Sequence, residues 1–147
     1  MDGNVDSGAG GKEAGKAGLE ELRYIQQIYQ NQYSVVGKEL EGKNISIREL
    51  DAAQRSLESI DSIKDKEALM PVGYDVYLHA RIAESSKPLV GVGAGYLVEK
   101  EVDEAKQYIA KEIEKKTKEI NNLMRAKKEI EAALIEISYR IDEAARE

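Results

Sequence analysis

Hydrophobic residues recur at alternating spacings of three and four along the first part of the chain, beginning at Leu19. Such spacing places them along one side of a helix, and its seven-residue repeat is typical of a left-handed coiled coil. The two rows of the repeat are Leu19, Gln26, Tyr33, Leu40, Ile47, Gln54, Asp61 and Leu22, Tyr29, Val36, Lys43, Leu50, Leu57, Lys64. Nine of these fourteen positions are apolar. The pattern therefore predicts a coiled-coil helix over residues 19–66.

A second repeat of the same kind occupies residues 101–147 and predicts a second helix there. Its rows are Val102, Ile109, Lys116, Leu123, Ile130, Ile137, Ala144 and Lys106, Ile113, Ile120, Lys127, Leu134, Ile141, of which ten in thirteen are apolar. The two predicted helices are nearly equal in length, and the segment between them returns the chain. We therefore expect an antiparallel two-helix coiled coil with both termini at its free end.

The first predicted helix contains one weak stretch. Gly37 and Gly42 each cost about 1 kcal/mol relative to alanine inside a helix, and residues 46–49 have the form of a capping box that could restart a helix after a break. A three-helix arrangement is therefore an alternative, although the heptad register crosses residues 37–46 unchanged. This stretch would lie opposite residues 121–128, which are also polar on their seam. We predict a flexible point at this height.

Between the helices, residues 67–100 alternate apolar with other residues, which is the period of β-strands. Val72-Gly73-Tyr74-Asp75-Val76 and Val92-Gly93-Ala94-Gly95-Tyr96 each have the form of a tight hairpin turn, in which glycine supplies a positive φ. Isolated hairpins are marginally stable in water, and their edges pair with further strands. We therefore predict two hairpins that join strands of other chains in a shared sheet or barrel. The predicted oligomerisation residues are Val72, Gly73, Val76, Leu78, Val90, Val92, Gly93, Gly95, Tyr96 and Val98.

Composition agrees with an α+β protein dominated by long helices. Charged residues make up 34% of the chain, and the 5% aromatic share is all tyrosine, which favours coiled coils over an enzyme wrapped around a pocket. Residues 1–18 contain six glycines and almost nothing to bury, so we predict a disordered tail.

Charge and sequence motifs exclude several classes of function. The net charge of −6 disfavours nucleic acid, and the absence of cysteine excludes thiolate metal sites and fits a reducing cytoplasm. The longest mainly apolar run, residues 88–98, is too short to span a membrane, and the N-terminus lacks a secretory pattern.

No residue pattern points to chemistry. A dinucleotide-binding loop that starts at Gly91 and Gly93 would need a third glycine where Tyr96 stands, and no Gly-Lys-Ser/Thr follows. His79, the only histidine, lies in a predicted strand without cysteine or paired carboxylates around it, so we interpret it as a sheet residue. We expect no enzyme activity, no cofactor and no metal.

The order helix, two hairpins, helix, together with Met70-Pro71-Val72-Gly73 and residues 89–100 (LVGVGAGYLVEK), closely resembles the alpha class of prefoldin subunits, of archaeal type. The resemblance implies a hexamer of two alpha-class and four beta-class subunits, with a double β-barrel body and six coiled-coil arms. It also implies an ATP-independent holdase that captures non-native proteins at the coil ends and delivers them to a group II chaperonin. Tyr74-Asp75 departs from the glycine-rich first turn of many members, which leaves that turn's geometry open.

Capture of unfolded chains predicts apolar residues near the ends of the coil, where pairing does not hide them. The expected client-binding residues off the seam are Tyr24, Ile25, Ile28, Ile135 and Tyr139. Seam residues that fraying of the coil ends would expose complete the set, namely Leu19, Leu22, Tyr29, Leu134, Ile137 and Ile141. Ordinary scatter of apolar residues on the surface or a wider packing stripe is the alternative interpretation of each. The alternative function is a structural coiled-coil tether or a filament-forming protein that assembles through its β edges.

Overall fold

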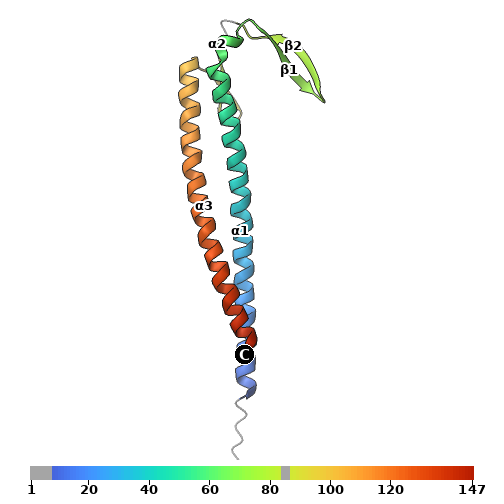
Figure 1. Ribbon diagram of the computed structural model, residues 1–147, viewed down its shortest axis with the longest axis vertical. Helices are drawn as coiled ribbons and strands as arrows, with labels where there is room; N and C mark the ends of the chain where they lie inside the picture. The colour runs from blue at the N-terminus through green and yellow to red at the C-terminus, as the bar shows by residue number, and fades with distance from the viewer. Residues whose placement is uncertain (1–7, 84–86) are drawn as a thin grey trace, which may run out of the picture. The chain divides into compact units, whose positions relative to one another are not determined.

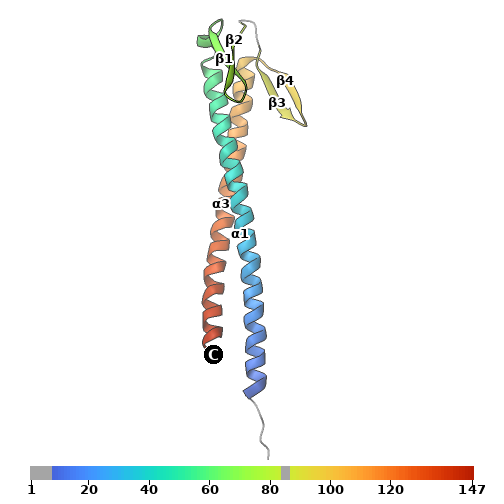
Figure 2. The same cartoon turned by 90° about the vertical axis from the view of Figure 1, so that its right-hand side faces the viewer.

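A computed structural model describes residues 8–83 and 87–147 of the chain and has the predicted order of elements (Figures 1 and 2). Its helices and strands are α1 (Gly8–Glu58), α2 (Ile60–Ile63), β1 (Glu67–Gly73), β2 (Val76–Arg81), β3 (Leu89–Gly93), β4 (Tyr96–Glu99) and α3 (Val102–Arg146). Two long helices thus enclose two hairpins in the sequence, which confirms the α+β class.

The chain divides into two compact units. The terminal unit contains α1 up to Lys43 and α3 from Glu119 onward. The hairpin unit contains residues 44–118, which are the rest of both helices, α2 and all four strands. Each long helix therefore contributes to both units.

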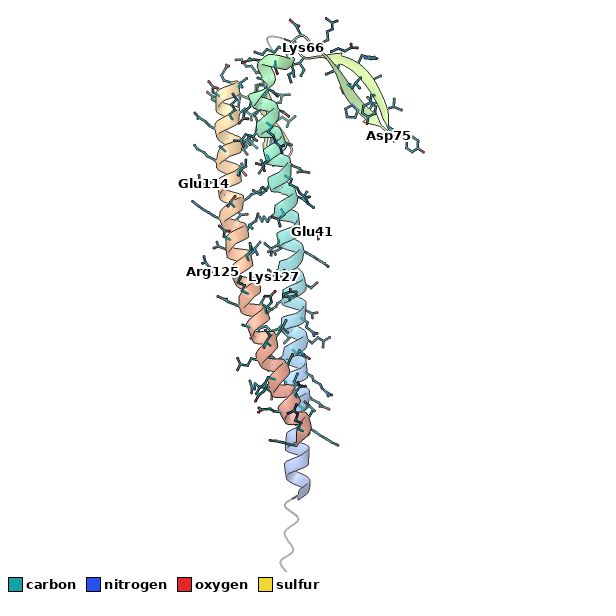
Figure 3. All side chains as sticks on the ribbon, in the orientation of Figure 1. Glu41, Lys66, Asp75, Glu114, Arg125 and Lys127 are labelled. Carbon is teal, nitrogen blue, oxygen red and sulfur yellow. The ribbon has the colours of Figure 1, made fainter. Side chains whose placement is uncertain are left out.

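In the terminal unit, α1 and α3 pack antiparallel. The Gln26 amide Nε2 donates a hydrogen bond of 3.3 Å to Ser138 Oγ, and Lys43 forms an ion pair with Glu119. The later residue on α1, Lys43, thus contacts the earlier residue on α3, Glu119. The two helices therefore run in opposite directions. Charged side chains on the outer side, such as Arg125, point away from α1 (Figure 3).

Apolar seam residues make the contact between the helices. Every predicted heptad position from Leu19 to Leu57 and from Val102 to Ala144 is buried or half-buried. Leu40, Ile109 and Ile137 are buried, and so is Ala105. This burial confirms both predicted seams, and removal of these side chains from water is the main favourable term in pairing.

The expected continuity of the first helix through Gly37 and Gly42 is confirmed, and the three-helix alternative is wrong, because α1 continues through both glycines. The seam residues on either side, Leu40 and Ile47, are buried and half-buried. Their burial outweighs the roughly 1 kcal/mol that each glycine costs in a helix. The flexible point stays a prediction. The boundary between the two units falls after Lys43, inside the same stretch.

The start of α1 differs from the prediction. It begins at Gly8 rather than at Leu19, so the expected disordered tail is wrong for residues 8–18, while residues 1–7 lie outside the described residues. Once a helix exists, each added residue gains a hydrogen bond without the cost of nucleation. Lysine, glutamate and alanine, which favour helices, make up most of residues 12–17.

The end of the first helix also differs, because α1 stops at Glu58 and only the short α2 follows before residue 66. Serine hydroxyls compete for the backbone carbonyls here: Ser59 Oγ donates to Arg55 O at 3.1 Å, and Ser62 Oγ donates to Ser59 O at 2.7 Å. Such bonds offer the chain an alternative to helix geometry.

The two hairpins form separate two-stranded antiparallel sheets, β1–β2 and β3–β4. The central turn residues have positive φ in both: 45° and 58° at Tyr74 and Asp75, and 52° and 80° at Ala94 and Gly95. Two successive positive φ angles are typical of a type I′ turn, which follows the twist of a hairpin. The two predicted turns are confirmed, and Tyr74-Asp75 adopts the left-handed geometry without glycine.

Within the described residues, neither long helix has a stretch long and apolar enough to cross a membrane.

Candidate functional site

Large apolar side chains are exposed on both hairpins. They are Leu69, Met70, Val72, Tyr74, Val76, Tyr77 and Leu78 on the first hairpin, and Leu89, Val92, Tyr96, Leu97 and Val98 on the second. Exposed apolar area of this extent marks an interaction surface. Each sheet has only two strands, so both of its edges also lack a neighbouring strand among the described residues. We call this set of residues and edges the assembly surface.

The structure places nine of the ten predicted oligomerisation residues on the exposed part of the hairpins, while Val90 is half-buried. Val90 pairs with Val98 across the second hairpin. Gly73, Gly93 and Gly95 have φ angles of 124°, 110° and 80°. The angles at Gly73 and Gly93 are ones that only glycine adopts without strain. The three glycines therefore shape the turns, and their part in oligomerisation stays a prediction.

Sequence reasoning missed six residues of the assembly surface, namely Leu69, Met70, Tyr74, Tyr77, Leu89 and Leu97. Alternation assigns one face of a strand to the core and the other to water. In a two-stranded sheet without a helix over it, neither face is covered. The signal was present in the sequence as apolar residues at successive positions, such as Leu69-Met70 and Tyr77-Leu78.

The second hairpin is tied to the start of α3 within the hairpin unit. The Lys100 backbone N–H donates to Pro88 O at 3.0 Å, and Tyr108 Oη donates to Gly91 O at 3.4 Å. Lys87 Nζ lies 2.8 Å from Glu101 Oε1. The hydrogen bond and the charge of Glu101 raise the pKa of Lys87 above its ordinary value.

The first hairpin has a different connection. The Asp65 N–H donates to Ile82 O at 3.0 Å, which closes the open end of the hairpin. Within the hairpin, His79 Nδ1 lies 2.5 Å from Glu67 Oε1 on the other strand. His79 thus lies in a strand as predicted. Among the described residues, no group of three histidine, cysteine or acidic side chains could hold a metal ion.

The second candidate surface is on the terminal unit. Tyr24, Ile28, Ile135 and Tyr139, all expected to bind clients, are exposed, with 65%, 39%, 73% and 63% of their surface accessible. Ile25 is half-buried. The expected seam residues Leu19, Leu22, Tyr29, Leu134 and Ile141 are also half-buried.

Ile137 differs from the other expected client-binding residues because it is buried, with 6% of its surface accessible. Its heptad position directs it into the seam, where α1 covers it. Its assignment as a client-binding residue stays a prediction that depends on fraying of the seam. Contact with another protein would require the two helices to separate.

Polar residues interrupt the seam of the terminal unit near Tyr33. Tyr33 Oη donates to Glu131 Oε1 at 3.0 Å, and Lys127 Nζ lies 5.2 Å from the centre of the Tyr33 ring. A cation over an aromatic face is attracted to it. These directional contacts favour one register of α1 against α3.

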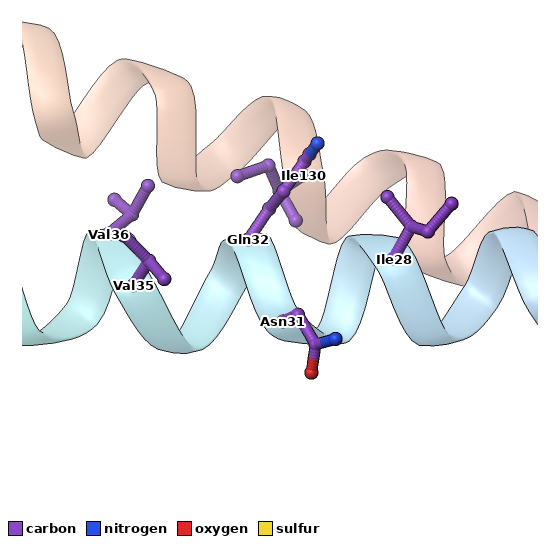
Figure 4. Close-up of a pocket in the computed structure, with 6 residues that line it drawn as sticks. All are labelled: Ile28, Asn31, Gln32, Val35, Val36 and Ile130. Atoms are coloured by element: carbon purple, nitrogen blue, oxygen red, sulfur yellow. The ribbon is translucent and has the colours of Figure 1, made fainter.

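A shallow groove runs along the outside of the coil in the terminal unit (Figure 4). Its volume is about 410 Å³, and it is lined by Ile28, Asn31, Gln32, Val35 and Val36 of α1 and by Ile130 of α3. Charged side chains are absent from this lining. The groove is adjacent to the expected client-binding residues, with which it shares Ile28.

Comparison with known proteins places these features in a family. The family model described as a prefoldin subunit matches residues 29–147. The prefoldin subunit alpha of Pyrococcus horikoshii is 34% identical over 130 residues, which cover 87% of this chain and 83% of the relative. The prefoldin subunit alpha of Thermofilum pendens is 33% identical over 105 residues, covering 66% of this chain and 81% of the relative.

A solved structure is similar over most of its length. It is a cryo-EM structure of filamentous PFD from Methanocaldococcus jannaschii, with a TM-score of 0.65 and 25% sequence identity. The match covers 78% of this chain and 95% of that chain.

Proposed function

The chain belongs to the prefoldin family of non-enzymatic chaperone subunits, and from this we propose that it is the alpha-class subunit of a cytoplasmic holdase. It captures non-native proteins without ATP and assembles with other prefoldin subunits. The observation that carries the proposal is the exposure of Tyr24, Ile28, Ile135 and Tyr139 near the ends of a paired coil. Apolar side chains exposed in this way bind the apolar segments that unfolded proteins also expose.

The assembly we propose is a hexamer of two copies of this chain and four beta-class subunits. The assembly surface supports this composition, because its two hairpins have exposed apolar faces and unpaired edges that strands of other subunits can cover. Native mass spectrometry of the complex purified from the source cells tests this composition. Six subunits with two copies of this chain are expected, and a monomer or a self-sufficient homo-oligomer would contradict the hexamer.

Client capture is tested by removing the apolar residues near the ends of the coil. We expect the combined variant Ile25→Ser, Ile28→Ser, Ile135→Ser and Tyr139→Ser to lose suppression of aggregation of a chemically denatured enzyme, measured by light scattering. The hexamer should stay intact, because these residues are outside the assembly surface and three of the four are exposed.

The matched control replaces apolar residues that are exposed elsewhere on the coil, Ile45→Ser with Met124→Ser. This variant should retain suppression. Equal activity in both variants would exclude the end of the coil as the client-binding surface.

Delivery to a group II chaperonin completes the proposal and follows from the family resemblance. A labelled client bound to the assembly should move to the chaperonin when the two complexes are mixed, which gel filtration can follow. A client that stays on the assembly would limit the function to capture.

A filament-forming protein is the second candidate. It is favoured by the similarity to a structure described as filamentous PFD, together with the unpaired edges of both hairpins. Electron microscopy of the purified chain without partner subunits separates the candidates. Long polymers would support the filament, whereas small discrete particles would favour the chaperone subunit.

A further inference from the structure

A segment of α1 without charge lies in the terminal unit. Residues 24–37 (YIQQIYQNQYSVVG) contain no lysine, arginine, aspartate or glutamate, although these residues make up 34% of the chain. Arg23 and Lys38 stand immediately on either side. A surface helix of a coiled coil normally carries charge outside its seam. The uncharged segment therefore has a surface unlike the rest of the coil.

The groove on the terminal unit is built almost entirely from this segment. Five of its six lining residues belong to residues 24–37, and the sixth is Ile130 of α3. Ile28 and Val35 are exposed at its rim, with 39% and 55% of their surface accessible. Figure 4 shows Val36 and Ile130 between the two helices, and Asn31 directed away from α3. The groove is thus lined by the aliphatic side chains of Ile28, Val35, Val36 and Ile130 and by the amide side chains of Asn31 and Gln32.

The amides at the rim are available for hydrogen bonds. Asn31 and Gln32 are exposed, and none of the side-chain hydrogen bonds found among the described residues involves either of them. Gln26 of the same segment, by contrast, is engaged with Ser138 across the seam. An amide side chain both donates and accepts, which is the pairing that a peptide group offers.

We propose that this groove binds an extended, uncharged segment of a non-native polypeptide. Aliphatic side chains of the segment enter the hollow against Ile28, Val35 and Ile130. Its backbone N–H and C=O groups pair with the amides of Asn31 and Gln32. The inference rests on the proposed function and deepens it, since it names the class of ligand and a site on the side of the coil.

The absence of charge selects this ligand over others. A nucleic acid or a charged coiled coil would need complementary charges, and the lining has none. A folded helix satisfies its own backbone groups internally, so it would leave the rim amides without partners. An extended chain is the polypeptide form whose backbone remains free to pair with both amides.

The experiment uses the full-length chain in its assembly with partner subunits. The probe is a fluorescein-labelled ten-residue peptide of alternating valine and serine, and its binding is followed by fluorescence anisotropy. Val35→Glu and Gln32→Glu should each weaken binding at least tenfold, because each places a carboxylate in or beside an uncharged hollow. The same peptide with N-methylated backbone amides should also bind at least tenfold more weakly.

Met124→Glu is the matched control, since it introduces the same charge at an exposed apolar residue of the terminal unit outside the groove. It should leave peptide affinity unchanged. Circular dichroism confirms that each variant stays folded, and Gln32→Glu tests the site even if Val35→Glu loosens the coil.

Suppression of client aggregation is measured on the same samples, so that the two proposals fail separately. If the wild type suppresses aggregation while Val35→Glu and Gln32→Glu bind the peptide normally, the groove proposal is overturned and the proposed function stands. If the wild type neither suppresses aggregation nor binds the peptide, both fail. Loss of subunits on Val35→Glu, seen by sedimentation, would show that the groove is a contact between chains and would overturn the groove proposal.

Discussion

The terminal unit and the hairpin unit use apolar residues in opposite ways. In the terminal unit, seam residues such as Leu40 and Ile137 are covered by the facing helix of the same chain. In the hairpins, residues such as Val76 and Tyr96 remain exposed on sheets of two strands. The seam of the terminal unit therefore completes its apolar contacts within the chain, whereas the hairpins leave most of their large apolar side chains exposed.

This difference separates two kinds of stability. Pairing of α1 with α3 is intramolecular, so its free energy does not depend on protein concentration. Burial of the assembly surface is intermolecular and follows mass action, so it strengthens as subunits are added. Substitutions in the two regions should consequently change different measurements.

The largest effect is expected from a charge in the seam. Leu40→Asp places a carboxylate at a position with 8% of its surface accessible, and should lower the free energy of unfolding by about 3 kcal/mol or more. Thermal unfolding followed by circular dichroism measures this change. Ser34→Asp, at an exposed position of the same helix, should have little effect. Equal melting temperatures for the two variants would contradict the seam.

Charges on the hairpins should abolish assembly without unfolding the helices. Val76→Asp with Leu78→Asp puts two carboxylates on an exposed strand, where only contact with other chains would bury them. Sedimentation should report the loss of subunits, while the helical circular dichroism signal stays unchanged. A variant that still assembles would exclude the first hairpin from the interface.

Two glycines of the second hairpin provide a matched pair with an intermediate effect. Gly93 has φ of 110°, so Gly93→Ala should cost about 1–3 kcal/mol in backbone strain. An added Cβ at Gly91 meets only the Leu97 side chain at 3.7 Å, an ordinary contact. Gly91→Ala should therefore leave the concentration needed for assembly unchanged, whereas Gly93→Ala should raise it. The opposite ranking would show that crowding, and not turn geometry, limits this hairpin.

The smallest effect is expected at the boundary between the two units. Beyond the neighbouring residues and the local helix backbone, no described atom lies within 4 Å of a Cβ built at Gly37 or Gly42. Gly37→Ala with Gly42→Ala should therefore stabilise the helix by about 1 kcal/mol for each glycine. Hydrogen exchange of residues 37–46 should slow if this stretch is the flexible point. Unchanged exchange would contradict the predicted flexibility and leave the gain in stability unaffected.

Periodicity predicted most of the fold because it reports local geometry directly. The heptads identified the seam, including its half-buried lysines, and the two repeated glycine sequences identified both turns. The ends of α1 were predicted less well. At its N-terminal end, α1 extends to Gly8. At its C-terminal end, α1 stops at Glu58, where Ser59 Oγ donates to Arg55 O, although the hydrophobic repeat continues beyond this point.

The heptad pattern also predicted part of the candidate client-binding surface, because it shows which residues are off the seam. Tyr24 and Tyr139 were expected to be exposed because they are off the seam, and they are exposed. Ile137 was expected to become accessible through fraying of the seam, and in the paired coil it is buried, since its accessibility depends on the facing helix.

The sequence by itself determined which residues form helices, where the turns occur and which residues face the seam, because these depend on neighbours within one or two turns of the chain. Only the tertiary structure decided what remains uncovered. The groove exists because Ile130 lies beside residues about a hundred positions earlier. The assembly surface exists because the helices leave most of the large apolar side chains of the hairpins exposed. Both depend on contacts between distant segments, which local patterns do not contain.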